Sequence, residues 1–266
     1  FSLITDIITL IQMINLYFIG SAGSGKSSLT GAFAGWMQNQ KYNAITVNLD
    51  PGIENAPYIP DVDIRDWIKL RDIMQEHGVG PNGAQIIAAD MLALNITEMK
   101  EVIESYETDY VIFDTPGQME LFVLRQSGKY LIDAFGADQS MIGFLYDPVI
   151  SKTPAGFISL MLQAASVQVR FNIPFLGVLT KSDLLPGEEL EKILNWSADL
   201  MSLEDAIHDE RPTFHSQLSI EFLSALKAFG ASQKIVPVSS KYGSGMEDIY
   251  NTAQQVFCGG EDLGKN

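Results

Sequence analysis

Two kinds of segment alternate along the chain. Short apolar runs, typical of strands buried on both faces, lie at 14–19, 43–49, 110–114, 139–146, 174–180 and 234–238. Longer segments with helical spacing of apolar residues lie at 28–38, 67–77, 84–106, 120–135, 153–169, 188–202, 214–229 and 245–257. This alternation predicts an α/β, doubly wound fold with a mostly parallel sheet and helices on both faces.

Two of the connections are predicted to be loops. Residues 53–66 are polar and contain Pro57 and Pro60, which predicts a long, shaped loop. The sequence GVGPNG at 78–83 predicts a second loop, and the first part of the helical segment after it could instead pair as a short strand. Because no repeat or linker divides the chain, we predict a single domain over residues 13–258 and a flexible tail at 259–266.

Residues 1–12 are predicted to be an extension of this domain. The segment is apolar, but Asp6 interrupts it and it lacks a basic start, so it predicts neither a secretory signal nor a membrane span. Met13 stands directly before the first strand, which indicates that 1–12 are an upstream addition rather than native sequence. A genuine extra helix or strand is the alternative.

The composition limits the possible partners and compartments. The chain carries 17 basic and 33 acidic residues, a net charge of −16, which argues against direct contact with nucleic acid or an anionic membrane. With 46% hydrophobic residues, 266 residues can bury a sizeable core. The single cysteine, Cys258, permits no disulfide within the chain, which favours a reducing, cytoplasmic location.

The stretch GSAGSGKSS at 20–28 fits the phosphate-loop pattern G-x-x-x-x-G-K-[ST] between a strand and a helix. Glycines let backbone N–H groups turn toward phosphate oxygens, and the helix start adds further N–H groups. Lys26 would reach the β- and γ-phosphates, and the Ser27 hydroxyl would bind Mg²⁺. The predicted phosphate-binding residues are Gly23, Ser24, Gly25, Lys26, Ser27 and Ser28. A glycine-rich turn without a ligand is the alternative.

A second motif, DTPGQ at 114–118, follows a buried strand. A carboxylate at such a position is costly unless it is paired or near a metal, so Asp114 is predicted to hold Mg²⁺, through water. The Gly117 N–H would sense a γ-phosphate, and Gln118 would orient the attacking water, as glutamine does in known GTPases. A plain turn is the alternative.

A third motif, TKSD at 180–183, resembles the guanine-reading sequence N-K-x-D, with Thr180 in place of asparagine. The Asp183 carboxylate would accept hydrogen bonds from N1–H and the 2-amino group of guanine, a donor pair that adenine lacks. The stem of Lys181 would cover the base. Ser239 and Ser240, after the last strand, resemble the S-A-K loop that backs the guanine. The predicted ligands are therefore GTP and GDP.

The order of these motifs resembles that of the GPN-loop GTPase family. Gly80-Pro81-Asn82 lies between the phosphate loop and DTPGQ, where that family carries its tripeptide. NLDP at 48–51, PDVDIRD at 60–66 and DTPGQME at 114–120 also resemble the family, and the likeness runs from about Met13 to Phe257.

The resemblance implies a homodimer, or a pair of related chains, in which Asn82 reaches the phosphate site of the partner. It also implies that Asp50 and Glu120 belong to the catalytic shell with Gln118 and Lys26. For Glu120, capping of the following helix is an equally good explanation. Arg65 and Asp66 belong either to a moving switch or to a surface ion pair.

We therefore predict a Mg²⁺-dependent GTPase that acts as a dimeric molecular switch. One alternative is an ATPase of the related dimeric class, although Ser21 stands where many of those proteins carry a second lysine. The other is a nucleotide-gated assembly factor with negligible turnover, in which GTP orders residues 50–66 and 78–83. The sequence names no protein client.

Overall fold

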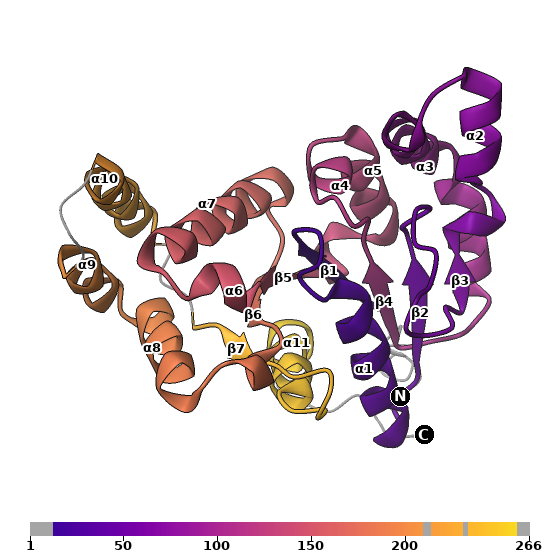
Figure 1. The fold of residues 1–266 in the computed structure, drawn as a ribbon. Helices are drawn as coiled ribbons and strands as arrows, with labels where there is room; N and C mark the ends of the chain where they lie inside the picture. The colour runs from indigo at the N-terminus through magenta and orange to yellow at the C-terminus, as the bar shows by residue number, and fades with distance from the viewer. Residues whose placement is uncertain (1–12, 210–213, 231–233, 260–266) are drawn as a thin grey trace, which may run out of the picture.

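A computed structural model describes residues 13–209, 214–230 and 234–259 (Figure 1). Seven strands form one sheet in the order β3-β2-β4-β1-β5-β6-β7, and every neighbouring pair is parallel. The strands are β1 Ile14–Gly20, β2 Ala44–Asn48, β3 Val62–Asp63, β4 Tyr110–Asp114, β5 Ser140–Tyr146, β6 Phe175–Leu179 and β7 Val236–Pro237. The predicted doubly wound fold is confirmed. The predicted extension at 1–12 and residues 260–266 of the predicted tail lie outside the described residues.

The helices connect and cover these strands. They are α1 Lys26–Asn39, α2 Leu70–His77, α3 Pro81–Glu104, α4 Glu120–Val123, α5 Gln126–Phe135, α6 Pro148–Ser151, α7 Pro154–Phe171, α8 Gly187–Ala198, α9 Leu200–His208, α10 Phe214–Phe229 and α11 Met246–Phe257. Helices α1 and α11 lie on one side of the sheet, and α3, α5 and α7 lie on the other (Figure 1). Over the described ranges, no helix is both long and apolar enough to cross a membrane.

The central strand β1 is buried on both faces. Ile14, Leu16 and Phe18 pack in the cluster formed with α1 and α11, whereas the alternate residues Tyr17 and Ile19 pack in the cluster formed with α3, α5 and α7. This division follows from the two-residue repeat of a strand. It explains why the strand appears in the sequence as an apolar run, in which Asn15 is the one polar amide.

The carboxyl ends of three neighbouring strands bring the predicted motifs together. In the register of the sheet, Asp114 at the end of β4 pairs with Phe18 of β1 on one side and with Asn48 of β2 on the other. The phosphate loop, the DTPGQ segment and the NLDP segment therefore leave the sheet at one edge. Ligands of open parallel sheets bind at this edge, near the point where the strand order reverses.

The prediction of a loop over 78–83 is wrong in its second half. Helix α3 begins at Pro81, and Gly80, which is extended, is its N-cap. Proline is favoured at the first helical position because its missing N–H would have no partner there. Asn82 is therefore in the first turn of a 24-residue helix. The alternative of a short strand at the start of the segment is also wrong.

Three further predictions need correction. The predicted helix at 120–135 is divided into α4 and α5, because Arg125 is extended (φ −86°, ψ 154°). The predicted helix at 188–202 is divided at Asp199, whose side chain accepts a hydrogen bond from the Met201 N–H and so caps α9. Residues 53–66 are not a loop throughout, because they include β3 and a 3₁₀ turn at Ile64–Asp66.

Candidate nucleotide-binding site

The predicted phosphate loop curls over the start of α1. Gly23 and Gly25 have φ values of 76° and 100°, a region that favours glycine, and Gly25 is the N-cap of the helix. Lys26, Ser27 and Ser28 form its first turn. Their backbone N–H groups stand at the positive end of the helix dipole, where a phosphate is favoured.

Lys26 connects the phosphate loop to the DTPGQ segment. Its Nζ donates hydrogen bonds to the carbonyl oxygens of Gly20 (2.8 Å), Ser21 (2.9 Å) and Gly117 (3.1 Å). The side chain is buried, and burial lowers its pKa to about 8. The negative charges of Asp114, Asp50 and Glu120 act in the other direction and raise the pKa. The lysine therefore lies close enough to Asp114, Asp50 and Glu120 to feel their charges.

Asp114 is wholly buried at the end of β4. Its Oδ2 accepts a hydrogen bond from the Tyr58 hydroxyl (3.1 Å), while its Oδ1 is buried without a hydrogen-bond partner. Burial raises the pKa of Asp114 to about 6, although the hydroxyls of Ser27 and Tyr58 and the charge of Lys26 lower it. An unpartnered carboxylate oxygen beside a serine hydroxyl fits Mg²⁺, which prefers oxygen ligands and keeps several waters.

The Asp114 site differs from a metal cage built by the protein alone. Within the part of the chain that the structure describes, no three His, Cys, Asp or Glu side chains gather as a metal site. Magnesium at phosphate sites is held by one or two protein groups together with substrate phosphates and water. Ser27 and Asp114 meet that requirement.

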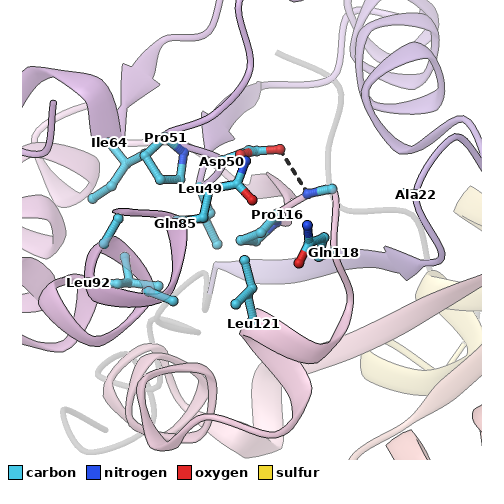
Figure 2. A pocket seen from close by; sticks show the side chains of 13 residues that line it. Ala22, Leu49, Asp50, Pro51, Ile64, Gln85, Leu92, Pro116, Gln118 and Leu121 are labelled. Carbon is cyan, nitrogen blue, oxygen red and sulfur yellow. Dashed lines mark hydrogen bonds between the residues drawn. The ribbon is translucent and has the colours of Figure 1, made fainter. Parts of the chain in front are cut away.

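Asp50 is hydrogen-bonded to the DTPGQ segment. Its Oδ2 accepts a hydrogen bond from the Gly117 N–H (2.8 Å), shown as the dashed line in Figure 2, and its Oδ1 accepts one from the Gly52 N–H (2.8 Å). The side-chain amide of Asn48 bonds to the backbone N–H of Asp50 (3.0 Å) and to its carbonyl (3.1 Å). The N–H predicted to sense a γ-phosphate thus already has a carboxylate acceptor.

A cavity of about 220 Å³ lies beside this contact (Figure 2). Gln118 and Asp50 line it together with Ala22 of the phosphate loop, and the rest of the wall is mostly apolar. Gln118 is exposed. Glu120 is exposed at the first position of α4, so both explanations given for it remain open.

Asn82 is the one predicted catalytic residue that stands apart from these groups. Its side chain is exposed near the start of α3 and lines neither this cavity nor the pocket on the guanine side. Gln85, one helical turn later, does line the cavity.

All the predicted guanine-side residues except Ser239 line a second pocket, of about 460 Å³. It is lined by, among others, Gly25, Ser28, Thr180, Lys181, Asp183 and Ser240. The Thr180 hydroxyl donates a hydrogen bond of 2.7 Å to the Ser24 carbonyl, so the residue that replaces asparagine fastens this loop to the phosphate loop. The Ser239 hydroxyl donates a hydrogen bond of 2.6 Å to Asp183 Oδ1, which fixes the direction of that carboxylate.

Sequence reasoning missed Tyr58 and Asp147, and it named Asn48 only as part of NLDP, without a role in the site. Asp147 directly follows the buried strand β5, much as Asp114 ends β4, and it forms an ion pair of 3.0 Å with Lys181. An acidic residue directly after a buried strand could therefore have marked Asp147 as a site residue from the sequence alone. No pattern marked Tyr58. Arg65 does form an ion pair, but with Asp63 (2.6 Å) rather than with Asp66.

Comparisons with known proteins agree with this geometry. A family model described as "Conserved hypothetical ATP binding protein" matches residues 18–259. The chain is 31% identical to GPN-loop GTPase PAB0955 of Pyrococcus abyssi, over 92% of this chain and 98% of that protein. It is 29% identical to GPN-loop GTPase 1 of Dictyostelium discoideum, over 90% of this chain but only 60% of that longer protein.

A solved structure extends the agreement to the fold. The crystal structure of PAB0955, titled a GTPase in apo form, superposes with a TM-score of 0.83 at 30% identity, and the match covers 93% of this chain and 98% of that one. The chain therefore belongs to the family of GPN-loop GTPases and is itself a GTPase.

Proposed function

We propose that this GTPase binds GTP together with Mg²⁺ at the phosphate loop and hydrolyses it as a dimeric switch. The observation that carries the proposal is the contact of Lys26 with the carbonyl oxygens of Gly20, Ser21 and Gly117. It draws the DTPGQ segment against the phosphate loop. A γ-phosphate bound there would therefore lie between the lysine and that segment, and would change the contacts of both.

The metal is assigned to Ser27 and Asp114. The buried, unpartnered Oδ1 of Asp114 supports this assignment, because a cation would compensate the cost of burying that oxygen. When bound, Mg²⁺ would neutralise charge on the phosphates. The role of the protein is to hold the serine hydroxyl and the carboxylate on adjacent elements, α1 and β4.

Specificity for guanine is assigned to Asp183. The hydrogen bond from Ser239 leaves the second carboxylate oxygen of Asp183 for the donors of the base, with Thr180 and Lys181 fastening the same loop to the phosphate loop. A competition experiment tests this against the ATPase alternative. An excess of ATP should leave bound GTP in place, and displacement at equal concentration would contradict the assignment.

Preparation of the water is assigned to Asp50 and Gln118. A γ-phosphate that takes the Gly117 N–H would compete with Asp50 for that donor. GTP would thereby free one oxygen of Asp50 to accept a proton from the attacking water. GDP has no γ-phosphate and would leave the hydrogen bond between Gly117 and Asp50 intact. The switch would then have two states, one with this hydrogen bond and one without it.

The dimer is proposed because Asn82 is exposed and lines neither pocket of its own chain. At the phosphate site of a partner, its amide would stabilise charge on the transferred phosphoryl group, as an arginine finger does with more charge. The single cysteine supports a reducing, cytoplasmic compartment. The net charge of −16 would suit a basic protein client.

The experiment that tests the proposal measures GTP hydrolysis per chain across a dilution series. Three proteins are compared: wild type, Asn82→Ala, and the control Asn251→Ala, which alters an exposed asparagine of α11. We expect specific activity to fall on dilution, and the Asn82 variant to be slow while it still binds GTP. Equal activity of all three proteins at every concentration would contradict catalysis across a dimer. Turnover near zero in the concentrated wild type would favour the assembly-factor alternative.

A further inference from the structure

The hydroxyl of Tyr58 is a hydrogen-bonding partner of Asp114, the carboxylate assigned to the metal. It lies in the segment between Asp50 and β3, and donates to Asp114 Oδ2 at 3.1 Å. The side chain is half-buried. An ionised carboxylate can only accept hydrogen bonds, so the Tyr58 hydroxyl is the donor in this contact.

A notch in α1 holds the tyrosine in place. A Cβ added at Gly31 would lie 2.9 Å from Tyr58 Cβ, closer than real Cβ atoms approach one another. The absence of a side chain at Gly31 therefore lets Tyr58 lie against the helix that begins at the phosphate loop. The tyrosine is fixed on one side by helix packing and on the other by its hydroxyl.

The two oxygens of Asp114 consequently have different surroundings. Oδ2 is occupied by Tyr58, whereas Oδ1 is buried and unpartnered. With one oxygen anchored, the carboxylate cannot rotate freely about its last torsion. The free oxygen keeps one direction, so a cation can be bound without breaking the contact with the tyrosine.

We propose that Tyr58 is a positioning residue for the metal-binding carboxylate, and that its hydroxyl holds Asp114 Oδ2 so that Oδ1 faces the Mg²⁺ of the bound nucleotide. This inference rests on the proposed Mg²⁺ site at Ser27 and Asp114. Hydrogen-bonding partners behind a metal ligand orient that ligand, and their loss costs about 10- to 100-fold in metal affinity.

The same contact links the metal site to the neighbouring segment. Pro57, the residue before Tyr58, lines the pocket on the guanine side, so two adjacent residues span from the base to the metal carboxylate. Ile59, the residue after Tyr58, is 93% exposed. Because coupling between sites is reciprocal, a metal that favours one orientation of Asp114 also favours the position of Tyr58 in which it donates.

The test measures release of a fluorescent GDP analogue from the full chain while Mg²⁺ is titrated, and again in EDTA. Tyr58→Phe removes only the hydroxyl. Gly31→Ala closes the notch, and because alanine is the better helix former, it does so without weakening α1. The matched control is Tyr130→Phe, which alters a tyrosine on α5 that is 56% exposed. Thermal melting of each variant shows that it is folded.

In wild type and Tyr130→Phe we expect Mg²⁺ to slow release at the same half-effective concentration. In Tyr58→Phe that concentration should rise by about 10- to 100-fold, and in Gly31→Ala it should rise in the same direction. Release in EDTA should be equal in wild type, Tyr58→Phe and Tyr130→Phe, because these two substitutions leave the phosphate loop and the residues that line the guanine-side pocket unaltered. Gly31 itself lines that pocket, so release from Gly31→Ala in Mg²⁺ is compared with release from the same variant in EDTA.

Other outcomes overturn the inference, and they separate its failure from that of the proposed site. A half-effective concentration unchanged in Tyr58→Phe would show that the hydroxyl does not position the ligand. A lower one would show that Tyr58 competes with the metal. Wild-type release insensitive to Mg²⁺ would contradict the proposed metal site itself, and the role of Tyr58 with it.

Discussion

The hydroxyl of Thr180 is predicted to fasten the guanine-reading loop to the phosphate loop, and Thr180→Val tests this. Thr180 is buried, with 2% of its surface exposed. Its Oγ1 lies 2.7 Å from the Ser24 carbonyl and 3.3 Å from the Tyr146 carbonyl. Valine has nearly the same shape but no hydroxyl, so the substitution removes the hydrogen bond and leaves the packing almost unchanged.

The expected cost follows from burial. Leaving a buried polar group without its partner costs about 1–3 kcal/mol. At about 2–4 °C per kcal/mol for a chain of this size, the melting temperature should fall by roughly 2–12 °C. The phosphate loop should also become less firmly held, so bound GDP should leave faster.

Thr252→Val supplies the control. Its Oγ1 donates a bond of similar length, 2.8 Å, to the Asp248 carbonyl within α11, but this bond is exposed to solvent. Water can replace a hydroxyl there, so the melting temperature should change little. The assay combines thermal melting of the nucleotide-free chain with stopped-flow release of a fluorescent GDP analogue.

Thermal melting and GDP release together distinguish a hydrogen bond that connects the two loops from a side chain that only fills space. If both variants lose the same stability and GDP leaves each at the wild-type rate, the bond from Thr180 does not connect the two loops. Threonine would then be a packing substitute for asparagine at this position.

Three further predictions concern stability and phosphate binding. In Gly128→Ala the new Cβ would lie 2.1 Å from a backbone carbonyl of α4, so the free energy of unfolding from thermal melting should fall by at least about 1–3 kcal/mol. In Gly35→Ala the new Cβ has open space, so the free energy of unfolding should rise by about 0.5–1 kcal/mol. Equal effects of the two substitutions would contradict the close approach of α4 and α5. Burial alone would raise the pKa of Asp63, but hydrogen bonds from Arg65 lower it below its ordinary value. That stabilisation is present above the unfolded pKa of about 3.9 and is lost as pH falls through the lower folded value, so the stability gap to Asp63→Asn should narrow below about pH 4, and parallel melting curves would argue against it. Lys26→Ala should lose both GTP affinity and hydrolysis, and retention of both in binding and turnover assays would contradict the phosphate-loop assignment.

The strands were predictable because their signal is local. β1, β4 and β5 are buried at every residue, so each appears in the sequence as an apolar run. β3 escaped prediction because it has only two residues, Val62 and Asp63, and exists through its pairing with β2. The other edge strand, β7, also has two residues, but Ile235 and Val238 flank it and make an apolar run, whereas β3 lies in a polar segment that contains prolines.

The missed boundary between α4 and α5 depends on tertiary contacts, whereas the one between α8 and α9 depends on the local cap at Asp199. Between α4 and α5, Arg125 forms an ion pair of 3.0 Å with Asp90 of α3, and Gly128 lies against the backbone of α4. Apolar spacing continues across this break, so periodicity alone merges the two helices. The start of α3 is a different case, because Pro81 is itself a helix-start signal. Gly78 and Gly80 beside it favoured the turn, and that reading was wrong.

The sequence motifs named many residues of the candidate site, but they did not predict the contacts between them. Asp50 and Gly117 are 67 residues apart in sequence, and Tyr58 and Asp114 are 56 apart. What joins both pairs is the pairing of β2 with β4, in which Asn48 lies opposite Asp114. The segments that leave these strands must then run side by side, so a carboxylate after β2 meets a backbone N–H after β4. A motif identifies a donor or an acceptor, but the strand order decides which acceptor the donor meets. The competition proposed between Asp50 and a γ-phosphate therefore follows from the sheet, not from either motif.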